Sequence, residues 1–572
     1  MHLGNLLKTI PKEYKTIDIR GISYDSRKVK KKYIFFAIKG TKTSGTEFID
    51  DAITKGASAI VSSKELKYKN SRVPFILVKD VRQNLTEAIS KFYKKKPKNI
   101  IAITGTNGKS SIADFFYQIL TINKVPVASI GTLGLFYKDH KKKTNLTSLD
   151  PISLHQSLQM LAKKKINNVI LEASSHGLDQ KRLDYLNIKT GIFTNFSHDH
   201  LDYHKSIKSY LNSKMYLFKN LLNKNSNIIT DEDNKEFKII NEIAKRKKIN
   251  QLTIGTNTGN IKILENIYFE NKQIVKVLIN SKIFSLDIPL IGYFQVKNLL
   301  MAILAATKSG IRQEKIFKQI KQIKPVAGRL ECVAKLKNNS KIIVDFAHTP
   351  DGLKQSLIAL KKQFNNKILI VFGCGGERDK SKRFQMGKIA KKYCRKVFVT
   401  DDNPRNENPA KIRYAIIKAC KKLAINVGSR RLAIEKGINE LNPNEILLIA
   451  GKGHETTQDY GKTIIKFSDQ KVVKKILSKV KLRIKKNYWP NFIAKKVFKT
   501  NNLNYNGASI NTKTIKKNNL FFAIRGKNVD GHKFIKEALK KGAIKAVIDK
   551  KVFGIPENKT IKVKNTFSSL ND

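Results

Sequence analysis

The stretch Asn99–Ser110 reads NIIAITGTNGKS and decides the fold of the middle of the chain. Its first half is a run of β-branched and small apolar residues, which predicts a buried strand. A glycine-rich loop with Lys109 follows, and then an apolar helical pattern over residues 111–120. This order predicts a phosphate-binding loop, because glycines let backbone N–H groups approach the phosphates at the start of a helix. Lys109 would place its charge on the outer phosphates, and Ser110 would offer a hydroxyl to magnesium.

The loop is a variant of the common Gly-x-x-x-x-Gly-Lys-Ser pattern, because Ile103 stands at the first glycine position. A chance glycine-rich turn is the alternative. The strand before the loop and the helix after it argue against that alternative. Taken alone, the loop predicts only a bound nucleotide.

Short apolar strands alternate with helical patterns after this loop. The expected strands are Asn168–Glu172, Thr190–Thr194, Lys341–Asp345, Lys367–Phe372, Lys396–Thr400 and Glu445–Ala450. Continuous apolar strands separated by helices are typical of parallel sheets covered on both faces. The sequence therefore predicts an α/β fold with two series of strands, divided near residues 323–325.

An internal repeat occupies the two ends of the chain. The segment 23–61 matches the segment that begins at Ser509 without a gap, so that Phe35 aligns with Phe521. Each copy reads as an apolar strand, a glycine turn, an amphipathic helix and a second apolar strand. The repeat predicts two versions of one small α/β domain.

Composition limits the class of protein. A chain of 572 residues with 41% hydrophobic residues is long enough for three or four domains with sizeable cores. No signal peptide or membrane-spanning run is recognised, so we expect a cytoplasmic location and no membrane partner. The four cysteines form no Cys-x-x-Cys pair, which favours reduced thiols. The net charge of +67 is spread along the chain, so only nonspecific nucleic-acid binding is expected.

Carboxylates and imidazoles gather where two of the predicted strands end. Glu172 ends one strand, and residues 194–204 read TNFSHDHLDYH after the next. Active sites of open α/β sheets collect at the carboxyl ends of the strands. Three histidines and two aspartates between His198 and His204 are too many for ordinary core positions. We interpret them as part of a magnesium-dependent nucleotide site.

In chain order the motifs read TGTNGKS, EASSHGL, TNFSHDHLDYH, GRLE, DFAHTPD, GCGGERDKSKR, DDNPR and GKGHE. This series resembles the Mur ligase family over roughly residues 1–480, and more narrowly its diaminopimelate-adding members. The resemblance implies an ATP-dependent, amide-forming ligase of peptidoglycan synthesis. Its substrates would be ATP, meso-diaminopimelate and UDP-N-acetylmuramoyl-L-alanyl-D-glutamate (UDP-MurNAc-L-Ala-D-Glu), joined through an acyl phosphate, with Mg²⁺ as cofactor.

The implied architecture is α/β with three ligase domains. Residues 1–92 would bind the UDP precursor, residues 93–325 would form a central P-loop-like ATPase domain, and residues 326–482 a Rossmann-like C-terminal domain that binds the amino acid. Residues 488–572 would be an appended second copy of the small domain. That copy resembles the N-terminal domain of the ligase that adds D-alanyl-D-alanine next. Two readings stay open for it: the start of a two-enzyme fusion, which we favour, and a docking domain for another cell-wall ligase.

The resemblance also assigns the ATP and metal sites. ATP would contact Gly105, Thr106, Asn107, Gly108, Lys109, Ser110, Asn298, Arg329 and Asp345. Magnesium would be held by Ser110, Glu172, His200 and Lys214. Lys109, His200 and Lys214 would be catalytic. At the position of Lys214 the family carries a carbamylated lysine (N6-carboxylysine), whose carboxylate binds a second magnesium. An ordinary surface lysine is the alternative.

The two other substrates are assigned in the same way. The UDP precursor would contact Ser26, Thr41, Lys42, Thr43, Thr147, Ser148, Ser174, Gln180 and Arg182. The diaminopimelate pocket would comprise Arg378, Asp402, Asn403, Pro404, Arg405, Gly451 and Glu455. Arg405 would clamp the distal carboxylate and Glu455 would pair with the distal ammonium. Gln295 departs from the usual Asn of the family, and His198 from the usual Arg or Gln.

Three other functions share parts of this pattern. A folylpolyglutamate synthase also combines an ATP loop with amide formation, but the repeat, the DNPR motif and the SSHGL motif argue against it. A lysine-adding ligase of the same family differs only in the amino acid. The non-enzyme alternative is a basic nucleic-acid-binding protein with a relic NTPase fold, for which DNA binding would be salt-sensitive.

Overall fold

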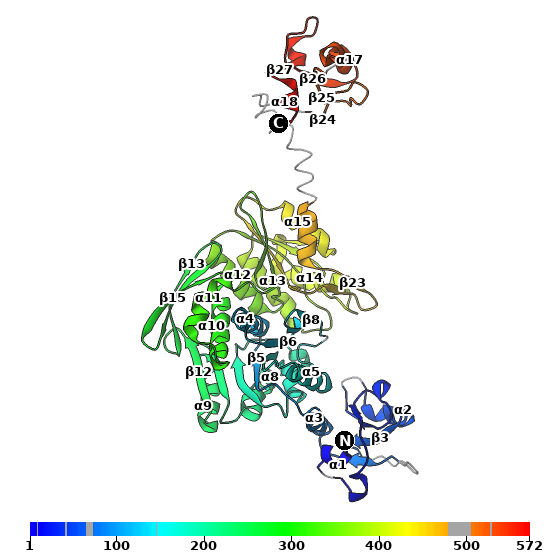
Figure 1. The fold of residues 1–572 in the computed structure, drawn as a ribbon, viewed down its shortest axis with the longest axis vertical. Coiled ribbons are helices and arrows are strands. Elements are labelled where there is room, and N and C mark those ends of the chain that lie inside the picture. The colour runs from blue at the N-terminus through cyan, green and yellow to red at the C-terminus, as the bar shows by residue number, and fades with distance from the viewer. Residues whose placement is uncertain are drawn as a thin grey trace. The chain divides into compact units, whose positions relative to one another are not determined.

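The computed structural model describes residues 1–8, 10–40, 43–64, 73–144, 146–478, 505–526 and 529–571. The chain divides into two compact units, Met1–Val472 and Val473–Asp572. Figure 1 shows the elements of both, coloured along the chain. The described part of the larger unit contains sheets of four, eleven and six strands and a two-stranded ribbon, and that of the smaller unit one sheet of four.

The first sheet is parallel, in the order β1-β2-β3-β4. Its elements are α1 (Leu3–Leu6), β1 (Gly21–Ser23), β2 (Tyr33–Phe36), α2 (Ile49–Thr54), β3 (Ala57–Ser62), β4 (Phe75–Leu77) and α3 (Val81–Phe92). The Asp80 side chain caps α3 by accepting a hydrogen bond from the backbone N–H of Gln83 at 2.9 Å. Val81, Leu85 and Ile89 recur at helical spacing along α3 and are buried in the core below the sheet.

An eleven-stranded sheet, in the order β15-β14-β13-β12-β11-β10-β5-β9-β6-β7-β8, forms the middle of the larger unit. Its strands are β5 (Asn99–Thr104), β6 (Val127–Gly131), β7 (Gly134–Tyr137), β8 (His140–Lys142), β9 (Asn168–Glu172), β10 (Ile188–Phe193), β11 (Asn227–Asp231), β12 (Asn250–Gly255), β13 (Ile261–Tyr268), β14 (Gln273–Ile279) and β15 (Lys282–Ile288). Its helices are α4 (Lys109–Ile122), α5 (Pro151–Lys163), α6 (Ser175–Asp179), α7 (Leu201–His204), α8 (Ile207–Tyr216), α9 (Phe237–Lys247), α10 (Tyr293–Lys308) and α11 (Gln313–Gln319). β5 lies between β9 and β10 and is parallel to both, so the loops after these three strands meet at one edge.

The strands predicted here, β5, β9 and β10, are parallel, but the edges of this sheet are antiparallel and were not predicted. β13, β14 and β15 form an antiparallel meander, and β7 and β8 are antiparallel additions beyond β6. Asn280 and Ser281, both with positive φ, close the tight hairpin between β14 and β15. Burial alternates along β14, as it does in an antiparallel strand with one face toward the core.

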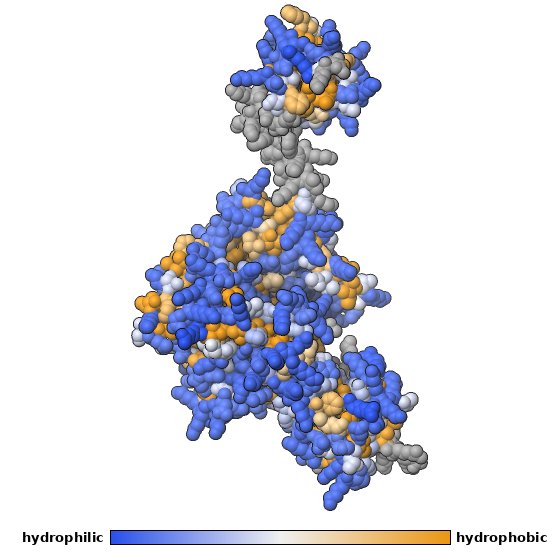
Figure 2. All heavy atoms as spheres, in the orientation of Figure 1, coloured by the Kyte–Doolittle hydropathy of each residue, from blue (hydrophilic) through white to orange (hydrophobic). Residues whose placement is uncertain are grey.

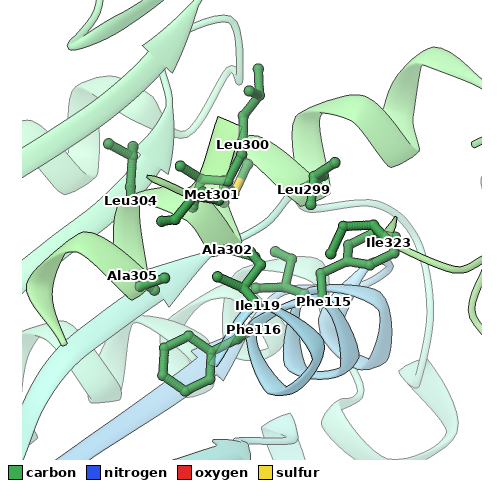
Figure 3. Close-up of a cluster of buried hydrophobic side chains, with 14 of the residues drawn as sticks. Phe115, Phe116, Ile119, Leu299, Leu300, Met301, Ala302, Leu304, Ala305 and Ile323 are labelled. Carbon is green, nitrogen blue, oxygen red and sulfur yellow. The ribbon is translucent and has the colours of Figure 1, made fainter. Parts of the chain in front are cut away.

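One of the two hydrophobic clusters in the described residues of this region contains α4 and α10, the helix that follows β15. Figure 3 shows Phe115, Phe116 and Ile119 of α4 packed against the apolar side chains of α10. Each large apolar side chain buried in this way contributes roughly 1.5–3 kcal/mol. This packing fixes α4, and with it the loop that precedes α4.

The third sheet has the order β16-β17-β21-β18-β19-β20, and only β16 is antiparallel to its neighbour. Its elements are β16 (Glu331–Lys335), β17 (Lys341–Asp345), α12 (Pro350–Phe364), β18 (Ile368–Phe372), α13 (Ser381–Tyr393), β19 (Lys396–Val399), α14 (Pro409–Cys420), β20 (Ala424–Asn426), α15 (Arg430–Asn439) and β21 (Ile446–Ala450). The ribbon β22 (Thr457–Asp459) and β23 (Ile464–Lys466) follows. The motifs DFAHTPD, GCGGERD, DDNPR and GKGHE thus stand at the carboxyl ends of β17, β18, β19 and β21.

The smaller unit contains a parallel sheet in the order β24-β25-β26-β27, the same strand order as the first sheet. Its elements are β24 (Gly507–Ser509), β25 (Asn519–Phe522), α17 (Ile535–Lys540), β26 (Ala543–Ile548), β27 (Thr560–Lys562) and α18 (Thr566–Asn571). β25 occupies the positions that align with β2, so the two repeats have matching strands at matching positions. The expected boundary between residues 482 and 488 lies outside the described residues.

On the face shown in Figure 2, hydrophilic residues cover most of both units. A search of the described residues finds no helix with the length and apolar character needed to cross a membrane. The four cysteines are free thiols, of which Cys332 alone is exposed.

Candidate active site

The loop between β5 and α4 is fixed by the strand beside it. The Thr194 hydroxyl donates to the carbonyl of Asn107 at 2.6 Å, and the side-chain oxygen of Asn195 accepts from the Asn107 N–H at 2.9 Å. Gly108 has a φ of 87°, and a Cβ there would lie 2.6 Å from Oδ1 of Asn298. Glycine is therefore required where Asn298 of α10 approaches the loop.

Two buried lysines converge on one carbonyl of this loop. Nζ of Lys109 and Nζ of Lys214 each donate to the carbonyl oxygen of Gly105 at 2.8 Å. Burial lowers the pKa of both amines, and the charge of Lys109 lowers the pKa of Lys214 further, well below its ordinary value. Lys214 is 1% exposed, so the alternative of an ordinary surface lysine is wrong. A buried amine with a depressed pKa is a nucleophile rather than a solvated charge.

Three of the four candidate metal ligands, Ser110, Glu172 and His200, line a cavity of about 300 Å³ together with Lys109, whereas Lys214 is buried and is not among the residues that line it. Glu172 ends β9, and its two oxygens accept from the backbone N–H and the hydroxyl of Thr132 at 2.9 and 3.0 Å. Burial lowers the pKa of His200 to about 3, which keeps its imidazole neutral. With the Ser110 hydroxyl, these groups offer a carboxylate, a neutral imidazole and a hydroxyl. That donor set fits a divalent cation, and Lys214 fits only once it carries a carboxylate.

Arg329 reaches the same cavity from the third sheet's domain. Its Nη2 donates to the Ser110 hydroxyl at 3.2 Å. Asp345 is not among the residues that line the cavity. Its carboxylate accepts the N–H groups of Leu330 and Ala347 at 2.8 and 2.6 Å. Asp345 therefore fixes the segment that carries Arg329.

The residues expected to bind the amino acid form another part of the cavity wall. Those that line it are Arg378, Asp402, Asn403, Arg405, Gly451 and Glu455. They lie on the loops after β18, β19 and β21, and Pro404 lies between two of them. Nδ2 of Asn403 donates to Oε2 of Glu455 at 2.9 Å, and Nη1 of Arg405 donates to the carbonyl of Gly376 at 2.6 Å. The cavity thus combines a phosphate loop with a pocket of mixed charge.

Two side-chain contacts join the central and C-terminal domains beside the cavity. Nε2 of His198 lies 2.8 Å from Oδ2 of Asp379, and Nη1 of Arg378 lies 3.6 Å from Oδ2 of Asp202. His198, to which sequence reasoning gave no role, therefore contacts the loop that carries Arg378.

A second cavity, of about 290 Å³, lies between the N-terminal and central domains. The predicted precursor contacts Thr43, Gln180 and Arg182 line it. Nε of Arg182 donates to Oε1 of Gln180 at 3.1 Å, and Nη1 donates to the carbonyl of Ser148 at 2.7 Å. The two cavities are separate pockets of the larger unit.

Comparison with known proteins assigns the chain to a family. Three family models match the chain. The model "Mur ligase middle domain" matches residues 103–306, and the model "Mur ligase, glutamate ligase domain" matches residues 328–453. The model "Mur ligase family, catalytic domain" matches residues 18–93 and 504–566. A Rickettsia montanensis protein named UDP-N-acetylmuramoyl-L-alanyl-D-glutamate--2,6-diaminopimelate ligase is 40% identical over 480 residues, which are 83% of this chain and 98% of that protein. The chain belongs to the Mur ligase family.

Other Mur ligases agree with this assignment. A protein of the same name from Brucella melitensis is 39% identical over 460 residues, covering 80% of this chain and 94% of its own length. A solved structure of a UDP-N-acetylmuramoyl-L-alanyl-D-glutamate--2,6-diaminopimelate ligase has a TM-score of 0.61 at 30% identity, covering 84% of this chain and 99% of its own. MurF ligase from Thermotoga maritima in complex with ADP has the same fold, with a TM-score of 0.56 at 18% identity over 80% of this chain and 97% of its own. The predicted three-domain Mur ligase fold is confirmed.

Some precursor contacts expected for a Mur ligase lie elsewhere. Thr147 and Ser174 line the first cavity rather than the second. Ser148 is buried between them, where its hydroxyl donates to the Glu172 carbonyl at 2.7 Å. Ser26 is also buried and lines neither cavity. Thr41 and Lys42 lie outside the described residues.

Several residues of this Mur ligase's cavities were missed by the sequence reasoning. In the first cavity they include Thr132, Phe346, His348 and Lys382, and in the second Tyr24, Phe48 and Arg82. Asp199 and Asp202 also line the first cavity, and they belong to the segment that the sequence already placed in the nucleotide site. Phe346 and His348 could have been found, because they follow β17 at its carboxyl end. Tyr24 and Phe48 carry no such signal, since only the packing of two domains brings them to a cavity.

Proposed function

We propose that this Mur ligase adds meso-diaminopimelate to UDP-MurNAc-L-Ala-D-Glu with ATP in the cytoplasm. The observation that carries the proposal is the cavity of about 300 Å³, which is lined both by the phosphate loop at Lys109 and by the Asp402–Arg405 loop. Nucleotide phosphates and an amino acid can meet there. The names of relatives 38–40% identical to the chain support the same substrates.

The reaction must first activate a carboxylate. The terminal phosphoryl group of ATP passes to an oxygen of the substrate's glutamyl carboxylate, and ADP leaves. The amine of diaminopimelate then attacks the acyl carbon and loses a proton as the amide C–N bond forms. The bond between the acyl carbon and the phosphate-bearing oxygen breaks, and inorganic phosphate leaves with that oxygen. Negative charge develops on the phosphoryl oxygens, so cationic and N–H groups fixed around them lower the barrier. Lys109, Arg329 and the first N–H groups of α4 supply those groups in this chain.

Magnesium, when bound, would neutralise charge on the phosphate oxygens. Ser110, Glu172, His200 and carbamylated Lys214 would hold it. Burial beneath the Gly105 carbonyl supports carbamylation, because a neutral Lys214 amine can add to carbon dioxide. The resulting carbamate would supply a carboxylate where the unmodified chain has an amine.

Selection of the amino acid would depend on both charges at the far end of diaminopimelate. Arg405 and Arg378 would bind the distal carboxylate, and Glu455 the distal ammonium. Lysine has the distal ammonium but lacks that carboxylate.

The enzyme is therefore expected to prefer meso-diaminopimelate over L-lysine by about 100-fold or more in kcat/KM, because lysine would leave the arginines unpaired. Steady-state phosphate release with saturating ATP and UDP-MurNAc-L-Ala-D-Glu measures both constants. Arg405→Lys should reduce the preference, since a lysine cannot reproduce the two parallel hydrogen bonds. A higher kcat/KM for lysine with the unaltered enzyme would exclude the proposed substrate.

The smaller unit is proposed to take no part in this ligation. In its described residues it has no phosphate loop, and neither of the cavities above contains one of its residues. Truncation after Lys485 is expected to leave kcat and all three KM values for diaminopimelate ligation essentially unchanged. Thermal unfolding of the truncated chain checks that it is folded. A large loss of activity in the folded truncation would instead mean that the unit serves the larger one.

A further inference from the structure

The carboxylate proposed to bind the distal ammonium belongs to Glu455, and it contacts the buried lysine Lys452. Lys452 follows Gly451 in the loop after β21, and its side chain is 0% exposed. It is not among the residues that line the cavity. A buried ammonium is costly unless it is paired, so its partners indicate its role.

Both side-chain partners of Lys452 belong to the proposed amino-acid pocket. Its Nζ lies 2.6 Å from Oε2 of Glu455 and 2.9 Å from Oδ1 of Asn403. Asn403 Nδ2 donates to the same Oε2 of Glu455 at 2.9 Å. Oε2 of Glu455 therefore receives two donors within the protein.

The same network fixes the orientation of the Asn403 amide. Oδ1 of Asn403 accepts from Lys452 and, at 3.0 Å, from the backbone N–H of Asp459. With two donors on the oxygen, the amide nitrogen must point to Glu455. Glu455 is 32% exposed at its side chain, and within the described residues no hydrogen bond engages Oε1. One oxygen of Glu455 is thus fixed and the other is free for a ligand.

A second buried cation supports the neighbouring loop ends. Arg430 donates through Nε and Nη2 to the two oxygens of Asp469 at 2.8 Å each, and through Nη2 to the carbonyl of Ala450 at 2.9 Å. Ala450 directly precedes Gly451, so this contact fixes the start of the loop that carries Lys452. Arg430 itself does not line the cavity.

We propose that Lys452 is a positioning residue for amino-acid selection, which acts by holding Glu455 and Asn403 in the orientation that receives the distal ammonium group. The proposal rests on the proposed function of this cavity. Lys452 itself touches neither ATP nor the amino acid. Without the Lys452 side chain the pocket residues would still be present. The Glu455 carboxylate that must meet the ammonium, however, would no longer be held in one orientation.

The test is the variant Lys452→Met, which keeps the length of the side chain and removes its charge. We expect the KM for meso-diaminopimelate to rise roughly 100-fold, because the buried cation that holds the Glu455 carboxylate is removed. The KM for ATP and for the UDP precursor should stay within about threefold, since neither touches this network. Lys341→Met is the matched control: Lys341 is a lysine of the same domain with a 4% exposed side chain, paired with Glu270, and should leave the KM for diaminopimelate unchanged.

A double-mutant cycle then separates positioning from general stability. In the Glu455→Gln background, Lys452→Met should add little further loss, because its main partner is already altered. Lys452→Gln keeps a hydrogen-bond donor group, so its KM for diaminopimelate should lie between those of the unaltered enzyme and Lys452→Met. It replaces Lys452→Met in the test if the methionine variant does not fold. An unchanged KM for diaminopimelate, additive effects in the cycle, or an equal rise in the KM for ATP would overturn the proposal. Failure of the unaltered enzyme to ligate diaminopimelate would refute the proposed function instead.

Discussion

Lys109→Ala is expected to lower ATP-dependent phosphate release by about 100-fold or more while the protein stays folded. Nζ of Lys109 lies among the carbonyl oxygens of its own loop, at 2.8 Å from Gly105 and 2.8 Å from Thr106. It lines the cavity rather than an apolar core, so its loss removes charge from the phosphates and not packing. Phosphate release with all three substrates measures the effect.

Thermal unfolding and circular dichroism provide the control for Lys109→Ala. The apolar residues of α4 that pack on α10, seen in Figure 3, are untouched by the change. The unfolding temperature should therefore change little. Turnover close to that of the unaltered enzyme in a folded variant would remove Lys109 from the catalytic residues.

Lys214→Ala is expected to be nearly inactive, with a loss of about 100-fold or more, and to regain part of its activity when a short carboxylate is added. The side chain is buried and donates to the Gly105 carbonyl, and burial together with Lys109 lowers its pKa. Those conditions favour a neutral amine that adds carbon dioxide. A short carboxylate such as acetate can occupy the space left by alanine and present the same oxygens. Activity as a function of carboxylate concentration is the measurement.

Lys208→Ala is the matched control, because Lys208 lies on the same helix, α8, and is exposed. It should retain full activity and show no response to added carboxylate. A carbamate carbon bound to Lys214 should also be visible by nuclear magnetic resonance after incubation with ¹³C-bicarbonate. Full activity of Lys214→Ala, or no such signal in active enzyme, would contradict the assignment.

The sequence predicted the parallel strands because their signals are local. NIIAIT became β5 over Asn99–Thr104, NVILE became β9 over Asn168–Glu172, and KIIVD became β17 over Lys341–Asp345. The antiparallel meander β13–β15 was not predicted. Its strands have one face toward the core and contain charged residues on the other, so they lack the continuous apolar run on which the other strands were recognised.

The candidate site was predictable to the extent that its residues stand in motifs at strand ends. Lys109, Glu172 and Arg405 line one cavity although they are far apart in the chain. Lys452 stands inside a recognised motif but received no role, because its burial and its contact with Glu455 depend on the packed loop. The contact of His198 with Asp379 joins two domains, and no pattern within one segment indicates such a contact.

The most direct test of the account is a single reaction with purified protein, Mg²⁺, ATP, UDP-MurNAc-L-Ala-D-Glu and meso-diaminopimelate. Phosphate release and mass spectrometry of the UDP-linked product are measured together, with each substrate omitted in turn. We expect ADP, phosphate and a precursor heavier by one diaminopimelate residue in equal amounts, and no product when any substrate is left out. No ATP turnover by folded protein with the complete mixture, combined with tight, salt-sensitive binding to DNA, would contradict it and favour a basic nucleic-acid-binding protein.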